Sequence, residues 1–168
     1  LTPKNYLIGH NSGVKTTGSY NSFMGFESGA ANTTGAKNTF LGYRSGYANV
    51  SGTNNVFLGY ETGIANTTGE NNVFLGTDAG FSNTLGSYNV FIGTYSGYSN
   101  IGSGPMGFPG NYNVFLGYNT GFSNTGSYNV FIGFESGRNT IGGEHNAFMG
   151  YQAGKSNTSG FSNVFIGD

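Results

Sequence analysis

The chain has 168 residues, enough for one domain, with 36% hydrophobic residues, 8% charged residues and a formal net charge of −1. The charges are scattered singly, which leaves no basic surface for nucleic-acid phosphates, and the absence of cysteine excludes disulfides and thiolate metal sites. The 32 glycines are typical of either a disordered chain or a repeat protein, and the 15 phenylalanines and 12 tyrosines favour the repeat protein, because disordered chains are poor in aromatic residues.

From the N-terminus onward, the pattern N-x-F-[LIM]-G recurs ten times, with Leu7 in place of phenylalanine in the first copy. Most copies are 17 residues apart, two intervals are one residue shorter, and one interval contains an insertion of seven residues at about 103–109. A fixed short period of this kind predicts a solenoid that occupies the whole chain, 1–168, as a single domain. The ten repeats begin at Asn5, Asn21, Asn38, Asn55, Asn72, Asn89, Asn113, Asn129, Asn146 and Asn163.

Each repeat reads approximately N-V-F-L-G-Y-E-S-G-F-S-N-T-T-G-S-Y, and its residues are numbered here as repeat positions 1 to 17. Positions 1 to 5 are rich in β-formers and predict a strand, and a second, weaker strand is expected near positions 10 to 14. Glycine at positions 5, 9 and about 15 predicts corners that need positive φ or close approach of the backbone. The predicted fold is therefore all-β: a parallel β-solenoid of ten coils.

Stacking of the coils converts each repeat position into a column along the rod, with about 4.8 Å between neighbours. Position 1 then predicts an asparagine ladder, and position 3 predicts a stack of aromatic rings. The ladder comprises Asn21, Asn38, Asn55, Asn72, Asn89, Asn113, Asn129, Asn146 and Asn163. The stack comprises Phe23, Phe40, Phe57, Phe74, Phe91, Phe115, Phe131, Phe148 and Phe165. Position 7 is polar or charged in nearly every copy and predicts a column that faces solvent.

The main strand is apolar on both faces, because positions 2 and 4 point away from position 3. A coil of 17 residues encloses only one interior, so the second apolar face needs another cover. We expect further copies of the chain to provide that cover, as a parallel homotrimer. The alternative is that the chain's own turns, with Tyr43, Tyr60 or Tyr118, fold over the face.

The pattern N-x-F-[LI]-G-x-x-[ST]-G resembles the head repeats of trimeric autotransporter adhesins and the repeat tracts of bacterial tail-fibre-like surface proteins, as in residues 72–86. The resemblance covers essentially the whole chain. It implies a parallel β-roll, trimerisation and a location outside the cell or on its surface. The adhesin heads differ in having a repeat near 14 residues and smaller side chains at the central strand position.

Reactive residues are few and do not form recognisable motifs. The only histidines, His10 and His145, lie far apart in the stack, and the carboxylates do not follow the repeat of calcium-binding β-rolls. We therefore predict no catalytic residue, no metal site, no cofactor and no enzymatic activity.

Four surface features allow more than one interpretation. Sequons at Asn32, Asn49, Asn66 and Asn157 could carry glycans, although a turn or ladder role explains asparagine at this position in nearly every repeat. Repeated threonine at positions 13 and 14 resembles an ice-binding array, but Val50, Leu85 and Ile101 interrupt it.

Aromatic residues at positions 6 and 10 could stack on sugars or pack against a partner chain. The insertion predicts a loop whose Met106 and Phe108 could contact a neighbour or a ligand.

These features together predict a structural extracellular fibre or shaft segment that self-assembles. The alternative is an adhesin head that recognises glycans or a cell surface through its aromatic columns. No apolar run approaches the about 18 residues of a membrane span, and no signal peptide is recognisable. Because neither end has a polar cap, we expect either an excerpt of a longer protein or rods that stack head to tail.

Overall fold

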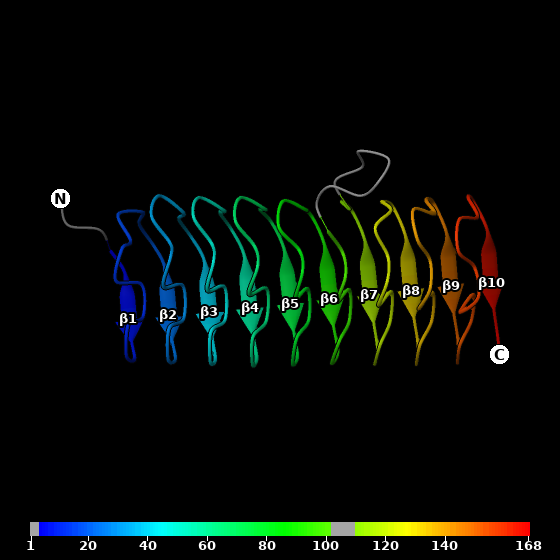
Figure 1. Ribbon diagram of the computed structural model, residues 1–168, viewed down its shortest axis with the longest axis horizontal. Helices are drawn as coiled ribbons and strands as arrows, with labels where there is room; N and C mark the ends of the chain where they lie inside the picture. Colours follow the sequence, from blue (N-terminus) through cyan, green and yellow to red (C-terminus); the bar gives the residue numbers. More distant parts are fainter. Residues whose placement is uncertain (1–3, 102–109) are drawn as a thin grey trace.

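The computed structural model describes residues 4–101 and 110–168, in which ten short parallel strands line up along one rod (Figure 1). The strands form a single sheet in which each strand pairs with its neighbours in the sequence, in the order β1 to β10. No helix long and apolar enough to cross a membrane occurs in the described ranges. The strands are β1 (Tyr6–Ile8), β2 (Ser22–Met24), β3 (Thr39–Leu41), β4 (Val56–Leu58), β5 (Val73–Leu75), β6 (Val90–Ile92), β7 (Val114–Leu116), β8 (Val130–Ile132), β9 (Ala147–Met149) and β10 (Val164–Ile166).

Every strand consists of repeat positions 2 to 4, and neighbouring strands pair position for position. Phe74 of β5, for example, lies beside Phe91 of β6, as Leu75 lies beside Ile92. Because this register holds from β1 to β10, each repeat position becomes a column. The predicted β-solenoid and its tandem repeats are therefore confirmed.

The expected second strand near positions 10 to 14 is wrong: each described coil contains one strand. Positions 5 to 12 instead form successive tight turns, as in the bonds from Ala30 N to Glu27 O (3.3 Å) and from Asn32 N to Gly29 O (3.0 Å). The same segment still bonds to the next coil, since Ala31 N donates to Tyr47 O at 3.0 Å. The turns at 25–28 and 27–30 have left-handed third residues, Glu27 (φ 53°) and Gly29 (φ 58°), which a continuous strand would not contain.

The core is the column of phenylalanine rings at position 3. Rings on neighbouring coils stack almost parallel, with centroids 4.8 Å apart for Phe57 and Phe74. Position 9 must be glycine beside this column: Gly63 has φ +58°, and a Cβ atom there would lie 2.7 Å from the Phe57 ring. From Phe23 to Phe148 the stack is almost inaccessible to solvent, and Phe165 on the last coil is exposed.

The asparagine column at position 1 bonds in two directions. The Oδ1 atom of Asn55 accepts the backbone N–H of Asn72 on the next coil at 2.9 Å, while its Nδ2 atom donates to Gly69 O at 2.8 Å. The same pair of bonds recurs along the rod, and the Asn72 side chain is fully buried. Each amide therefore provides an acceptor for a buried backbone N–H of the next coil, and it shares a glycine carbonyl with the asparagine at position 12, as Asn55 and Asn66 share Gly69 O.

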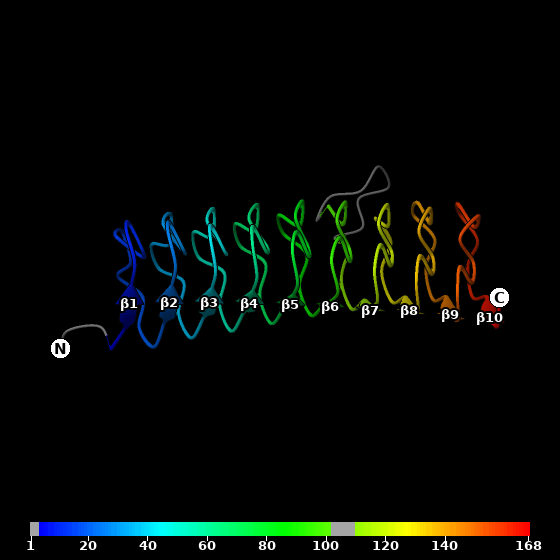
Figure 2. The same cartoon turned by 90° about the horizontal axis from the view of Figure 1, so that it is seen from below.

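The sheet is straight, and its strands keep nearly the same direction along the rod (Figures 1 and 2). Sheets usually twist, and flat ones depend on stacking or side-chain ladders. The asparagine ladder and the phenylalanine stack supply that support here. Figure 2 shows that the strands lie along one side of the rod and the turns along the other.

Candidate assembly surface

The outer face of the sheet, formed by positions 2 and 4 of all ten strands, is a continuous uncharged surface. It contains Tyr6, Ile8, Ser22, Met24, Thr39, Leu41, Val56, Leu58, Val73, Leu75, Val90, Ile92, Val114, Leu116, Val130, Ile132, Ala147, Met149, Val164 and Ile166. Only Ser22 and Thr39 are polar, and no position carries a charge. We call this surface the outer sheet face.

The described turns do not cover the outer sheet face. Leu41 and Leu116 are 42% and 43% exposed, whereas Phe40 and Phe115, which neighbour them in the same strands, are fully buried. Tyr43, Tyr60 and Tyr118 stack with other rings along the rod and remain exposed themselves. Within the described residues, the aromatic turns of the chain therefore do not fold over the outer sheet face.

A shallow apolar hollow of about 350 Å³ marks the N-terminal end of the outer sheet face. It lies over β1 to β3, where the small side chains of Ser22 and Thr39 alternate with the larger Ile8, Met24 and Leu41. The hollow is wide enough to receive apolar side chains of a partner.

A second asparagine ladder, at position 12, runs inside the coils. Asn49 Nδ2 donates to Asn32 Oδ1 at 2.7 Å, and Asn66 Nδ2 donates to Asn49 Oδ1 at 2.8 Å. All three side chains are fully buried, and the nitrogen atom that a glycan would occupy is a hydrogen-bond donor inside the rod. A glycan on Asn32, Asn49 or Asn66 is incompatible with this folded arrangement. Asn157 is half-buried, and its Nδ2 atom is also shielded from solvent.

A column of small hydroxyl residues at position 8 was not assigned a role from the sequence. Ser45 Oγ donates to Phe57 O at 2.9 Å, and Thr62 Oγ1 donates to Gly76 O at 2.6 Å, so these side chains join neighbouring coils. The recurrence of serine or threonine at position 8 was the feature of the sequence from which this hydrogen-bonding role could have been predicted. The threonine hydroxyls at position 13 are used in the same way, since Thr67 Oγ1 donates to Thr84 O at 3.0 Å.

The aromatic columns at positions 6 and 10 expose ring edges more than ring faces. Phe26, Tyr43 and Tyr60 stack nearly parallel with centroids 5.4 and 5.1 Å apart, and Tyr98 and Phe122 stack with an interplanar angle of 2°. A sugar ring packs on the face of an aromatic ring. Inside these columns, neighbouring rings already occupy the faces.

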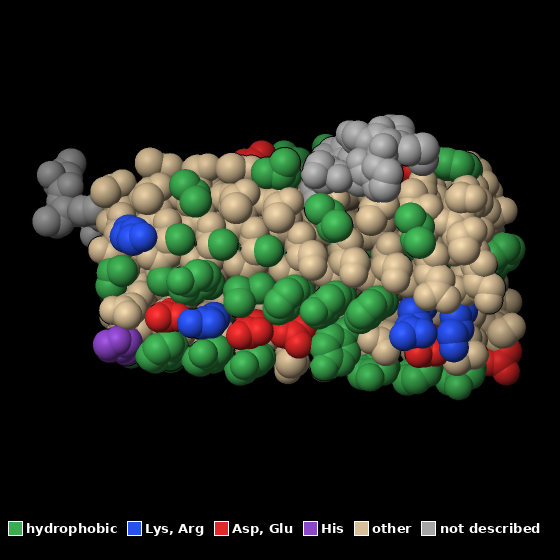
Figure 3. All heavy atoms as spheres, viewed as in Figure 1, with side chains coloured by type: hydrophobic (Ala, Val, Ile, Leu, Met, Phe, Trp, Pro, Cys, Tyr) green, Lys and Arg blue, Asp and Glu red, His purple; other side chains and the backbone are tan. Residues whose placement is uncertain are grey.

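The position 7 column forms a row of charges between two hydrophobic rows (Figure 3). Arg44 Nε donates to Glu27 Oε2 on the preceding coil at 2.8 Å, and its guanidinium lies 5.2 Å from the Tyr47 ring centroid. Such half-exposed ion pairs contribute little stability individually. The row lies on the turn side and leaves the outer sheet face free of charge.

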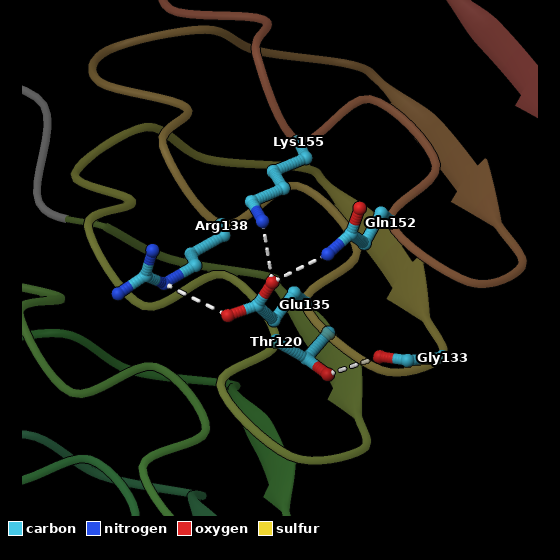
Figure 4. A network of polar contacts seen from close by, with 6 residues as sticks. All are labelled: Thr120, Gly133, Glu135, Arg138, Gln152 and Lys155. Atoms are coloured by element: carbon cyan, nitrogen blue, oxygen red, sulfur yellow. Dashed lines mark hydrogen bonds and ion pairs between the residues drawn. The ribbon is translucent and has the colours of Figure 1, made fainter. Parts of the chain in front are cut away.

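At the C-terminal end of this row, Glu135 accepts bonds from several partners (Figure 4). Its carboxylate lies 2.6 Å from Lys155 Nζ, 2.9 Å from Gln152 Nε2 and 3.5 Å from Arg138 Nε. The bond from Lys155, followed by that from Gln152, holds the pKa of Glu135 below its usual range, and burial opposes the shift.

Glu61 and Asp78 occupy the same row on adjacent coils, and among the described residues neither forms an ion pair. Burial, and then the charge of Glu61, raise the pKa of Asp78. Its Oδ1 atom is shielded from solvent and has no hydrogen-bond partner. This stretch is the electrostatically unfavourable part of the row.

The remaining predicted site residues do not converge on a chemical centre. His10 stacks on Phe26 and His145 stacks on Tyr128, seven coils apart in the repeat and in separate columns. No group of three or more metal-ligating side chains is found within residues 4–101 and 110–168. Met106 and Phe108 lie outside the described residues, so their predicted contact role stays a prediction.

Comparisons of the chain with protein-family models, with curated proteins and with solved structures give no match.

Proposed function

We propose that the protein is a structural segment of an extracellular fibre or shaft, in which copies of the chain associate laterally through the outer sheet face. The observation that carries this proposal is the continuous uncharged face itself, which is exposed over β2, β3 and β7 and half-buried over β4 to β6. The internal ladders make the rod straight and rigid, which is what a shaft needs. The extracellular location rests on the resemblance in the repeat pattern.

The size of the face supports association. Ten strands spaced about 4.8 Å apart and three residues wide give a strip of about 45 by 10 Å, or roughly 450 Å². Apolar patches of this size on monomers commonly mark interaction sites. At about 25 cal/mol per Å², complete burial contributes about 11 kcal/mol per chain, which is comparable to the cost of association.

A parallel homotrimer is the assembly we propose. With rods parallel and in register, each coil meets the same coil of its partners, so position 2 and 4 side chains converge at every level along a common axis. The straightness of the rod lets this contact continue without a change of register. End-to-end stacking of rods would extend the same assembly into a filament.

An adhesive role through the aromatic columns is the alternative that the sequence left open. The stacking of the rings supports the structural role instead, because it commits their faces to the rod. A glycan array tests the alternative directly, and binding that Tyr60→Ala abolishes would favour it.

Light scattering and negative-stain microscopy of the purified chain test the structural proposal. We expect a mass of three chains and rods whose length matches about 45 Å per copy. Monomers at all concentrations, with a globular outline, would contradict it.

A further inference from the structure

Three pairs of tyrosines lie stacked on adjacent coils with their side chains at the surface. At position 17, Tyr88 and Tyr112 have ring centroids 4.9 Å apart, and Tyr112 and Tyr128 have centroids 5.0 Å apart. At position 6, Tyr43 and Tyr60 lie 5.1 Å apart. The rings of each pair are within 9° of parallel.

The backbone holds the position 17 tyrosines in place. Tyr88, Tyr112 and Tyr128 all have φ between 57° and 60°, and their N–H groups donate to the preceding coils at 3.0 to 3.2 Å. Their side chains are nevertheless 45%, 45% and 49% exposed. Anchored main chains with accessible rings keep the phenols close while leaving them free to rotate about their side-chain bonds.

We propose that these stacked pairs are sites of oxidative dityrosine cross-linking between adjacent coils. A peroxidase-type one-electron oxidant, acting with hydrogen peroxide, removes one electron and one proton from each phenol. The two phenoxyl radicals couple through their ring carbons ortho to oxygen, and each ring regains aromaticity by moving its ortho hydrogen to oxygen as a proton. In sum, two tyrosines and one hydrogen peroxide give one dityrosine and two waters.

Proximity decides which tyrosines couple. Radical coupling is bimolecular in solution, and the rod converts it into a reaction between neighbours held about 5 Å apart. Tyr20 and Tyr47 lack this advantage, since the next coil carries Lys37 and Ile64 at their positions. Tyr112 has a tyrosine neighbour on both sides and belongs to two of the three stacked pairs.

A cross-link would join coils covalently, much as a disulfide does. The link between Tyr112 and Tyr128 would close a loop of one repeat and prevent these coils from separating during unfolding. The inference does not depend on lateral assembly, because both rings of each pair belong to one chain.

Oxidation of the purified chain by horseradish peroxidase and hydrogen peroxide tests the inference. Dityrosine fluorescence gives the yield, and a mass lower by two hydrogen atoms identifies the intrachain product. Cleavage after glutamate separates fragment 28–61, which contains Tyr43, Tyr47 and Tyr60, from fragment 71–135, which contains the position 17 tyrosines together with Tyr95, Tyr98 and Tyr118. Tandem mass spectrometry of each fragment identifies the linked residues. We expect cross-links in both fragments, in chains that remain monomeric on a denaturing gel.

Tyr112→Phe keeps a stacking ring and removes both position 17 pairs, so we expect the products that link Tyr112 to Tyr88 or Tyr128 to be lost while the Tyr43–Tyr60 product remains. The matched variants Tyr20→Phe and Tyr47→Phe should leave the yield unchanged. The Tyr43–Tyr60 product within fragment 28–61 reports that each variant is folded. Equal losses in all three variants, the same products in concentrated urea, or products only between chains would overturn the inference.

Discussion

The two faces of the same strands are both apolar, but from β2 to β9 the inner face is buried while the outer face is exposed or half-buried. On β7, Phe115 is fully buried, whereas its neighbours Val114 and Leu116 are 37% and 43% exposed. One column of rings fills the interior of a 17-residue coil, and no described segment covers the other face. The inner face therefore stabilises the single chain, while the outer face remains available for a partner.

The inner face should be the more sensitive to truncation. Phe74→Ala removes a fully buried ring from the centre of the stack, and we expect the free energy of unfolding to fall by about 3–5 kcal/mol. Chemical denaturation checks this value. Leu75→Ala on the outer face is the matched control, and an equal loss in both variants would abolish the distinction between the faces.

The asparagine ladder should come next in magnitude. Asn72→Ala leaves the N–H of Asn89 without its side-chain acceptor inside the rod and removes one of the two side-chain donors to Gly86 O, the other being Asn83 Nδ2. We expect a loss of about 2–3 kcal/mol in the free energy of unfolding, because buried polar groups without partners are costly. Thr68→Ala, at an exposed turn, is the control and should change little.

The outer face should affect assembly more than folding. Leu75→Lys places a charge at the middle of the outer sheet face, so we expect association to be lost in light scattering. The free energy of unfolding of the single chain should change by less than about 1 kcal/mol, because the side chain can reach solvent. Thr68→Lys introduces the same charge on the turn side, and loss of association there as well would contradict the assignment of the interface.

The smallest expected effects concern pH and have opposite signs at two places in the charged row. The pKa of Asp78 is raised from its ordinary value of 3.8, so its contribution to stability falls as the pH rises above that value. The pKa of Glu135 is lowered from 4.5, so its contribution is present above that value and is lost as the pH falls through the lowered pKa.

Denaturation of Asp78→Asn and Glu135→Gln across this range checks the signs. The first variant should be more stable than the parent chain at neutral pH, and the second should be less stable. The same sign in both variants would show that the local environments of the two carboxyls do not control their titration.

The repeat period predicted most of the architecture, but it did not predict the conformation of the turns. The recurrence of Asn, Phe and Gly at fixed spacing predicted the columns. The second strand was predicted near positions 10 to 14, between the glycines at positions 9 and about 15, which were expected to mark corners. In the structure, position 7 residues such as Glu61 and Asp78 adopt positive φ, 49° and 55°, which starts a series of turns. Side chains of this type rarely adopt that conformation, so no local signal marked it.

The candidate surface was predictable in part. The alternation of Val73, Phe74 and Leu75 showed that one apolar face would lie outside the coil. Whether turns such as that of Tyr43 would fold back over this face depended on the path of the chain after Gly42, at φ +135°. Trimerisation stays a prediction.

The sequence by itself determined the repeat, the strand register and the buried columns, because identical coils can stack only by placing identical positions above one another. The tertiary structure alone decided the shape of the turns, the commitment of aromatic faces to the rod and the exposure of the outer sheet face. These features depend on how the backbone reverses direction at left-handed positions, and a repeat spacing contains no information about that geometry.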